Sequence, residues 1–150
     1  MASYFFDTSA LAKHYHPEQG TAEVDRILNE QGSRYIVSRL LVVEIQSAFA
    51  TKVRTHIITA QDLQQLQKRF ATDLNTRRFE TIRMLQSHFS EAAQLLRKYA
   101  ATQSLRTLDA LQLSVALDMH RKGIIDHFVC ADEKLCKVAQ AEGLSIINPS

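Results

Sequence analysis

The stretch Tyr4-Phe5-Phe6-Asp7-Thr8-Ser9 places a carboxylate and two hydroxyls directly after a short apolar run. Aromatic residues favour a buried strand, and Asp and Ser are favoured caps of a following helix. The stretch Phe128-Val129-Cys130-Ala131-Asp132-Glu133-Lys134 repeats this pattern near the other end of the chain. An apolar strand that ends in an acid and leads into a helix is typical of a parallel α/β sheet, whose functional groups gather beyond the carboxyl ends of the strands.

Between these two stretches, β-prone runs alternate with helical patterns. Strands are predicted at residues 4–6, 34–37, 79–83, 127–131 and 145–147. Helices are predicted from a Ser38 cap to residue 55, from a Thr59 cap to residue 74, over 89–102, from a Thr107 cap to residue 122, and over 133–141. This alternation favours right-handed crossovers, so the predicted fold is α/β, a three-layer α/β/α sandwich with a mostly parallel central sheet.

Length and composition indicate one folded domain. The chain has 150 residues, of which 45% are apolar and 23% charged, close to the average of globular proteins. No linker or low-complexity segment divides it, so residues 1–150 are predicted to be a single domain. No apolar run reaches the roughly 18 to 20 residues that span a bilayer, and Asp7 comes too early for a signal-peptide core. We therefore expect a cytoplasmic protein that does not enter membranes. The formal charge of +2 is too small to indicate nucleic-acid binding by bulk electrostatics alone.

Two further acids are embedded in apolar helical sequence. Glu44 follows the run Leu40-Leu41-Val42-Val43, and Asp109 stands in the first turn of another predicted helix. A carboxylate removed from water must be protonated, ion-paired or metal-bound, unless it turns out to solvent. Taken singly, each acid has a structural explanation, because Asp7 and Asp132 can cap helices and a first-turn Asp109 favours the helix dipole.

Together, Asp7, Glu44, Asp109 and Asp132 can converge on one edge of the predicted sheet. Carboxylates packed at one place repel each other and need a counter-cation. Oxygen ligands without well-placed histidines suit Mg²⁺ or Mn²⁺ better than zinc or copper. Such a cation activates water and stabilises charge on a phosphoryl oxygen, which is the chemistry of phosphodiester hydrolysis. Asp7 and Asp109 are the first-choice metal ligands, with Glu44 and Asp132 as additional or water-mediated ligands.

Other catalytic patterns are missing from the sequence. The six histidines have no spaced partners, and Cys130 and Cys136 do not form a CxxC pair, so structural roles are predicted for both residue types. Without a Gly-rich phosphate loop, a GxSxG elbow or a Cys-His motif, nucleotide-triphosphate, serine-hydrolase and dehydrogenase activities have no support. Four basic residues near the acidic edge could neutralise phosphates, although a solvated surface charge is the simpler explanation for each: Lys13, Arg39, Arg106 and Lys134.

The sequence resembles the PIN-domain family, and most of all the VapC toxins of bacterial toxin-antitoxin pairs. The resemblance rests on an apolar-flanked Glu44 and three short blocks: Phe6-Asp7-Thr8-Ser9-Ala10-Leu11, Leu108-Asp109-Ala110-Leu111-Gln112-Leu113 and Val129-Cys130-Ala131-Asp132-Glu133-Lys134-Leu135. These features stand in order within a match that runs from residue 4 to residue 149 and so covers nearly the whole chain.

The resemblance implies an endoribonuclease that cuts RNA with Mg²⁺ or Mn²⁺. By motif position, Asp7, Glu44, Asp109 and Asp132 take the family's acidic catalytic roles, and Thr8 or Ser9 positions a water or a phosphate. It also implies a cognate antitoxin whose tail fills the acidic groove, a homodimer, and promoter DNA that is bound only through the antitoxin.

Three alternatives stay open at this point. Glu133 is a neighbouring carboxylate that competes with Asp132 for the fourth acidic role. An aspartyl-phosphate phosphatase would use Asp7 as its nucleophile, although Ser9 stands where such an enzyme would carry a second acid. A non-catalytic PIN-like scaffold would only bind a partner, but the presence of all four acids counts against it.

Overall fold

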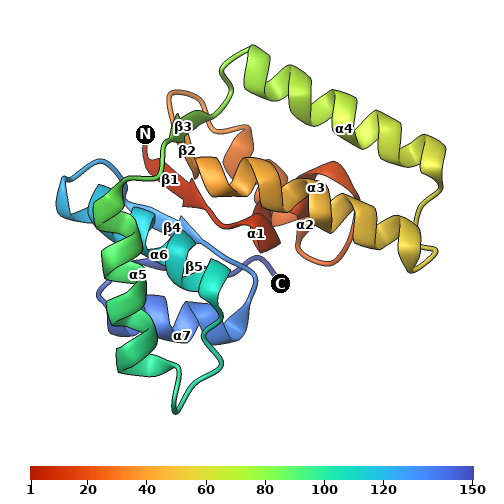
Figure 1. Cartoon of the computed structure of the whole chain (residues 1–150). Coiled ribbons are helices and arrows are strands. Elements are labelled where there is room, and N and C mark those ends of the chain that lie inside the picture. The colour runs from red at the N-terminus through yellow and green to blue at the C-terminus, as the bar shows by residue number, and fades with distance from the viewer.

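Five short parallel strands form the central sheet of the molecule, in the order β3-β2-β1-β4-β5 (Figure 1). This computed structural model describes residues 1–150. The elements follow each other along the chain as β1 (Ser3–Phe6), α1 (Thr8–Tyr15), α2 (Thr21–Leu28), β2 (Arg34–Ser38), α3 (Arg39–Arg54), α4 (Ala60–Asn75), β3 (Glu80–Ile82), α5 (Gln86–Tyr99), α6 (Thr107–Arg121), β4 (His127–Val129), α7 (Glu133–Ala141) and β5 (Ile146–Ile147).

Helices cover both faces of this sheet because its strands are buried on both sides. Successive side chains of a strand point to opposite faces, so Phe5 packs on one face and Tyr4 and Phe6 on the other. The face of Phe5 is covered by α5, α6 and α7, and the opposite face by α1 to α4. The predicted three-layer α/β/α sandwich with a parallel sheet is confirmed.

Two predicted helices begin and end earlier than expected, and side-chain caps explain their starts. The helix expected over residues 89–102 is Gln86–Tyr99, and the ring Nδ1 of His88 accepts the backbone N–H of Leu85 at 2.9 Å at its start. The helix expected after a Thr107 cap is instead capped by Arg106, whose backbone N–H donates to Asp109 Oδ2 at 3.3 Å. A third-position acid that bonds back to the cap residue satisfies one of the free N–H groups of a helix start.

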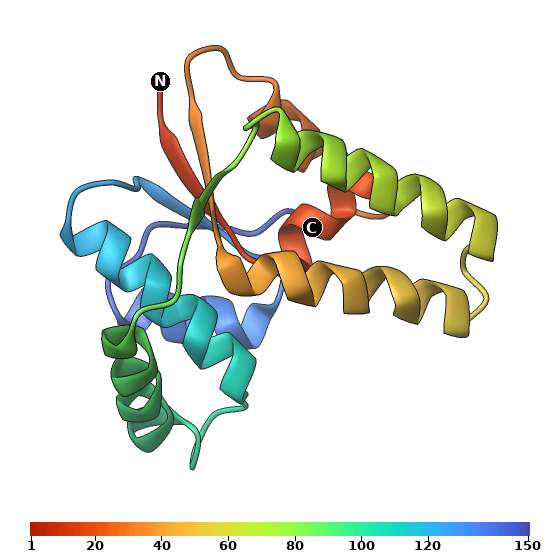
Figure 2. The same cartoon turned by 45° about the horizontal axis from the view of Figure 1, so that its top comes forward.

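The carboxyl ends of the parallel strands meet at one edge of the sheet, where the acids of the opening stretches lie. Asp7 follows β1 directly, and β4 beside it leads to Asp132. Helix α3 begins immediately after β2 and extends beyond the sheet alongside α4 (Figure 2). No helix of the chain combines the length and the hydropathy needed to cross a bilayer.

Candidate active site

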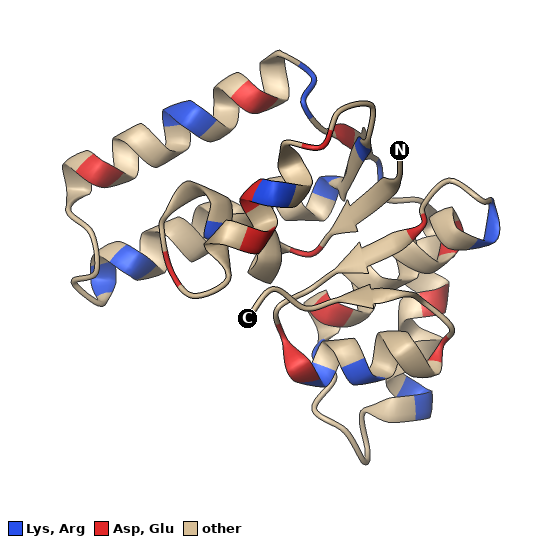
Figure 3. Cartoon of the chain, turned by 180° about the vertical axis from the view of Figure 1, so that it is seen from behind, with Lys and Arg blue, Asp and Glu red and all other residues tan.

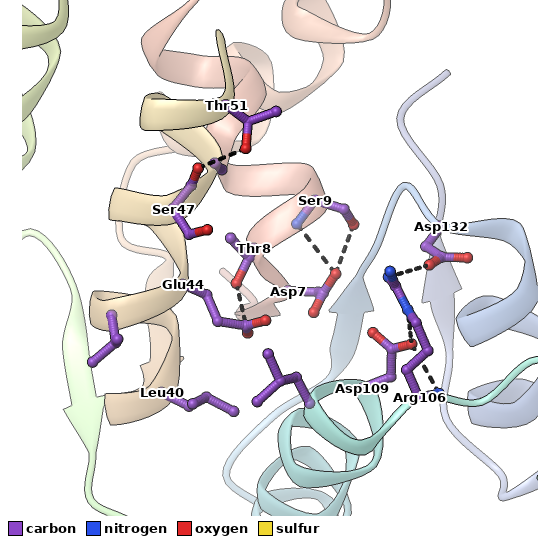
Figure 4. A pocket seen from close by; sticks show the side chains of 13 residues that line it. Asp7, Thr8, Ser9, Leu40, Glu44, Ser47, Thr51, Arg106, Asp109 and Asp132 are labelled. Carbon is purple, nitrogen blue, oxygen red and sulfur yellow. Dashed lines mark hydrogen bonds and ion pairs between the residues drawn. The ribbon is translucent and has the colours of Figure 1, made fainter. Parts of the chain in front are cut away.

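The four predicted acids line one pocket of about 370 Å³ at this sheet edge, together with Thr8 and Ser9 (Figure 4). Asp7 comes from the end of β1, Glu44 from α3, Asp109 from α6 and Asp132 from the start of α7. Apolar side chains form part of the wall, and two of them are exposed at its rim: Val43 and Leu108. The convergence of the acids predicted from the sequence is therefore present in the structure.

Asp7 and Asp132 both cap helices with one oxygen of the carboxylate. Asp7 Oδ2 accepts the backbone N–H of Ser9 at 3.2 Å and its hydroxyl at 2.6 Å. Asp132 Oδ1 accepts the backbone N–H groups of Lys134 and Leu135 at 3.0 and 3.3 Å. A cap needs only one carboxylate oxygen, so the structural and the functional explanations of these residues do not compete.

Glu44 and Asp109 are likewise held through one oxygen each. Glu44 Oε1 accepts the hydroxyl of Thr8 at 3.1 Å and the side-chain amide of Gln112 at 2.9 Å. Asp109 Oδ2 accepts the backbone N–H and the Nε–H of Arg106, both at 3.3 Å. The guanidinium of Arg106 also lies 3.7 Å from Asp132 Oδ2, so it bridges two of the acids.

The second oxygen of each carboxylate is left without a hydrogen bond inside the chain. These atoms are Asp7 Oδ1, Glu44 Oε2, Asp109 Oδ1 and Asp132 Oδ2, the last with only the Arg106 ion pair. A carboxylate oxygen has two lone pairs and retains its ability to accept. The pocket therefore offers four carboxylate oxygens to a ligand while the opposite oxygens fix the side chains.

Burial makes the charge of Asp7 costly. The residue is 5% exposed, and desolvation raises the pKa of its carboxyl from 3.8 to about 6. The two Ser9 hydrogen bonds lower this pKa, whereas the charges of Glu44 and Asp109 raise it further. Because like charges and low solvation both disfavour the anion, a cation in the pocket would relieve both penalties.

The donor set of the pocket fits a hard divalent cation. In the present arrangement no three histidine, cysteine or acidic side chains are close enough together to hold a metal ion. Mg²⁺ is commonly bound in proteins through one or two carboxylates and keeps several waters, so it does not require such a cluster. No histidine or cysteine lines the pocket, and its acidic and hydroxyl oxygens are the ligand type that Mg²⁺ and Mn²⁺ prefer.

The hydroxyls of Thr8 and Ser9 lie at the pocket, but both have partners within the chain. Thr8 Oγ1 donates to Glu44 and accepts the amide of Gln112 at 3.1 Å. Ser9 Oγ donates to Asp7 and accepts the backbone N–H of Ala131 at 3.0 Å. Both residues thus position acids, and their contact with a water or a phosphate stays a prediction.

Gln112 is a site residue that reasoning from the sequence missed. Its side chain is buried at 1% exposure and contacts Glu44 directly. The available signal was a lone amide within residues 110–117, which otherwise contain only Ala, Leu, Val and Ser. A polar group in such a stretch must find a partner once the helix is buried.

Of the four basic residues named from the sequence, only Arg106 lines the acidic pocket. Lys134 lines an adjoining hollow with Asp132 and Glu133. Lys13 instead forms an ion pair with Glu18. Charges of both signs are interspersed along the helices (Figure 3), and the formal net charge is +2.

Comparisons with known proteins agree with this fold. The profile described as PIN domain matches residues 4–141. No curated protein sequence gives a significant match. VapC20 of Mycobacterium tuberculosis, described as a toxin that cleaves the sarcin-ricin loop, has a TM-score of 0.69 at 15% identity, with 97% of this chain and 99% of that chain covered.

Two further structures share the fold at similarly low identity. FitAcB from Neisseria gonorrhoeae has a TM-score of 0.66 at 17% identity, with 97% of each chain covered. VapBC2 from Rickettsia felis, bound to a fragment of its promoter DNA, has a TM-score of 0.64 at 15% identity, with 99% of each chain covered. The chain therefore belongs to the PIN-domain family and has the fold of VapC-like toxins.

Proposed function

We propose that this chain is a Mg²⁺- or Mn²⁺-dependent endoribonuclease and the toxin of a toxin-antitoxin pair. The observation that carries the proposal is the convergence of Asp7, Glu44, Asp109 and Asp132 on one pocket, each with an oxygen free of hydrogen bonds within the chain. PIN domains are typically metal-dependent nucleases. VapC20, which shares the fold, is described as cleaving the sarcin-ricin loop, so RNA is the proposed substrate.

Asp7 and Asp109 would hold the metal ion, with Glu44 and Asp132 as additional or water-mediated ligands. The bound ion would stabilise negative charge on a phosphoryl oxygen and make water more acidic. Glu44 Oε2 is free to accept a proton from the attacking water as the new O–P bond forms and the bond to the leaving nucleotide breaks. Arg106 lies at the same pocket and is placed to contact a phosphate.

The proposed partners are a cognate antitoxin and a second copy of this chain. Structures with the same fold include a toxin-antitoxin complex from Klebsiella pneumoniae and a complex of FitAB with a DNA fragment. The exposed apolar side chains of Val43 and Leu108 at the pocket rim are suited to contact a protein segment that covers the acids. Promoter DNA would be bound only through the antitoxin, and the site of action would be the cytoplasm.

Metal dependence tests the proposed function. We expect the purified chain to cleave single-stranded RNA in Mg²⁺ or Mn²⁺, to stop in excess EDTA, and to recover when the metal is restored. The assay follows a labelled oligonucleotide on a denaturing gel. Cleavage that EDTA leaves unchanged would contradict the proposal. An acyl-phosphate on Asp7 would instead indicate an aspartyl-phosphate phosphatase. Metal binding without turnover of any RNA would indicate a non-catalytic PIN-like scaffold.

Asp132 and Glu133 can be separated by a matched pair of variants. Asp132 lines the acidic pocket, whereas the exposed Glu133 lines only the adjoining hollow. We expect Asp132→Asn to lower the rate of RNA cleavage by about 10- to 100-fold, as for loss of a water-mediated ligand of the metal ion. We expect Glu133→Gln to lower this rate by less than about twofold. Asn caps helices as well as Asp does, so α7 keeps its start. A larger loss in Glu133→Gln would transfer the fourth acidic role to Glu133.

A further inference from the structure

Gln112 is a buried amide on α6, one turn beyond Asp109, and every polar atom of its side chain is used. Its Oε1 accepts the hydroxyl of Ser38 at 2.7 Å. Its Nε2 donates to Thr8 Oγ1 at 3.1 Å and to Glu44 Oε1 at 2.9 Å. A side-chain amide offers two N–H donors and one acceptor oxygen, so these partners occupy all of its groups.

Ser38 fixes which way round the amide lies. Its hydroxyl oxygen caps α3 by accepting the backbone N–H of Leu41 at 3.2 Å, which leaves its single proton for Gln112 Oε1. If the amide were turned over, its oxygen would face the carboxylate of Glu44 and two acceptors would meet. The donor side of Gln112 is therefore directed at Glu44 by the fold.

The consequence for Glu44 is a fixed carboxylate. A glutamate side chain has several rotatable bonds and many conformations in water. Here Oε1 receives two donors, the hydroxyl of Thr8 from α1 and the amide of Gln112 from α6. Two bonds from different elements fix the plane of the carboxylate and leave Oε2 as the oxygen available to the pocket.

We propose that Gln112 is a positioning residue, which holds Glu44 in the orientation needed to face a divalent cation and the attacking water. This inference rests on the proposed function. It extends the site by a buried chain of groups that runs from the cap of α3 through Gln112 to Glu44. Outer partners that orient the ligands of a metal ion typically contribute about 10- to 100-fold to metal affinity or activity.

The test replaces Gln112 by an apolar side chain of similar length. In Gln112→Met both donors are lost, so we expect Mn²⁺ affinity in titration calorimetry to fall about 10- to 100-fold. We expect the turnover number for RNA cleavage to fall together with the Mn²⁺ affinity. KM for RNA should stay within about twofold, because Gln112 is buried away from the substrate. Ser114→Ala is the matched control, because Ser114 is a buried polar residue of the same helix that donates only to Leu111 O.

A double-mutant cycle separates positioning from packing. Gln112→Met is combined with Glu44→Ala, and Mn²⁺ affinity is measured for both single variants and the pair. If Gln112 acts through Glu44, its substitution has no further effect once Glu44 is gone. An equal loss in both backgrounds would mean that Gln112 only packs α6, and would overturn the inference.

A second variant decides the matter if Gln112→Met does not fold. Ser38→Gly removes the hydroxyl that orients the amide, and Gly is a tolerated helix cap. We expect Ser38→Gly to bind Mn²⁺ several-fold more weakly than the parent chain. A folded Gln112→Met or Ser38→Gly with unchanged Mn²⁺ affinity would contradict the role of Gln112. Failure of the parent chain itself to bind Mn²⁺ would contradict the proposed function instead.

Discussion

We expect Asp7→Asn and Asp109→Asn each to lower the rate of the proposed metal-dependent RNA cleavage by at least about 1000-fold, because a catalytic metal ion supplies several kcal/mol of charge stabilisation and each 1.4 kcal/mol is tenfold in rate. Asp7 Oδ2 and Asp109 Oδ2 accept hydrogen bonds that an asparagine oxygen can also accept. The substitutions thus remove the charge while the caps of α1 and α6 survive. Single-turnover rates on a labelled RNA in Mg²⁺ measure the loss.

Asp126→Asn is the matched control for this pair. Asp126 is an exposed acid that precedes β4, at the opposite edge of the sheet from Asp132, and accepts the backbone N–H of Ser3 at 2.9 Å. We expect its cleavage rate to stay within about twofold of the parent rate, because surface substitutions away from a site have small effects. Parent-level cleavage by folded Asp7→Asn and Asp109→Asn would place the reaction elsewhere on the molecule.

The architecture was predictable because its determinants are local. A short run of aromatic and β-branched residues followed by an acid that can cap a helix favours the carboxyl end of a strand, and parallel pairing then brings those ends to one edge. The pairing of Phe6 with Val129 in neighbouring strands is the long-range step, and it places Asp7 next to the chain that leads to Asp132. The alternation of strands and helices already favours this kind of pairing, so the pattern of the sequence was enough to place both acids at one edge of the sheet.

Glu44 and Asp109 were predictable for a different reason. Each is a carboxylate in an otherwise apolar helix face, and such a group must be compensated when the helix is buried. The sequence therefore indicates that a partner exists. It does not identify the partner, which for Glu44 is Gln112, a residue 68 positions away.

What could not be predicted is which oxygen of each carboxylate is hydrogen-bonded within the chain and which is left for a ligand. The amide of Gln112 reaches Glu44 only because α3 and α6 meet at the sheet edge, and its orientation depends on Ser38. The bridge that Arg106 forms between Asp109 and Asp132 depends in the same way on tertiary structure. Hydrogen bonds between distant side chains leave no periodic signal in a sequence, in contrast to the local patterns that set strands and helices.

We also expect Asp7→Asn to raise the stability of the metal-free protein at pH 7 by about 3 kcal/mol. The pKa of Asp7 rises from 3.8 to about 6 in the folded chain, chiefly through desolvation. Each unit of difference in pKa between the folded and the unfolded chain changes the free energy of unfolding by about 1.4 kcal/mol. A raised pKa means that the folded chain holds the proton more tightly than the unfolded chain. The stability that Asp7 contributes is therefore fully present below pH 3.8 and is lost as the pH rises through about 6.

Asparagine keeps the capping oxygen and removes this pH dependence. At pH 7 in EDTA, we expect Asp7→Asn to melt about 6–12 °C above the parent chain, because about 1 kcal/mol shifts the melting temperature of a domain this size by about 2–4 °C. Near pH 4 the two melting temperatures converge, since Asp7 is then protonated in the folded chain. Scanning calorimetry between pH 4 and 7 measures the difference.

The same experiment with metal present connects stability to function. Saturating Mn²⁺ stabilises only a chain that binds it, so it should narrow or reverse the advantage of Asp7→Asn over the parent chain. Asp126→Asn, whose carboxylate is exposed, should follow the parent chain at every pH. If Asp7→Asn melted at or below the parent temperature in EDTA at pH 7, burial of the Asp7 charge would carry no energetic cost. If Asp7→Asn melts higher than the parent chain in EDTA and loses this advantage in Mn²⁺, the acidic pocket costs stability without a cation and the cation offsets that cost, as expected of a site that gives up stability for activity.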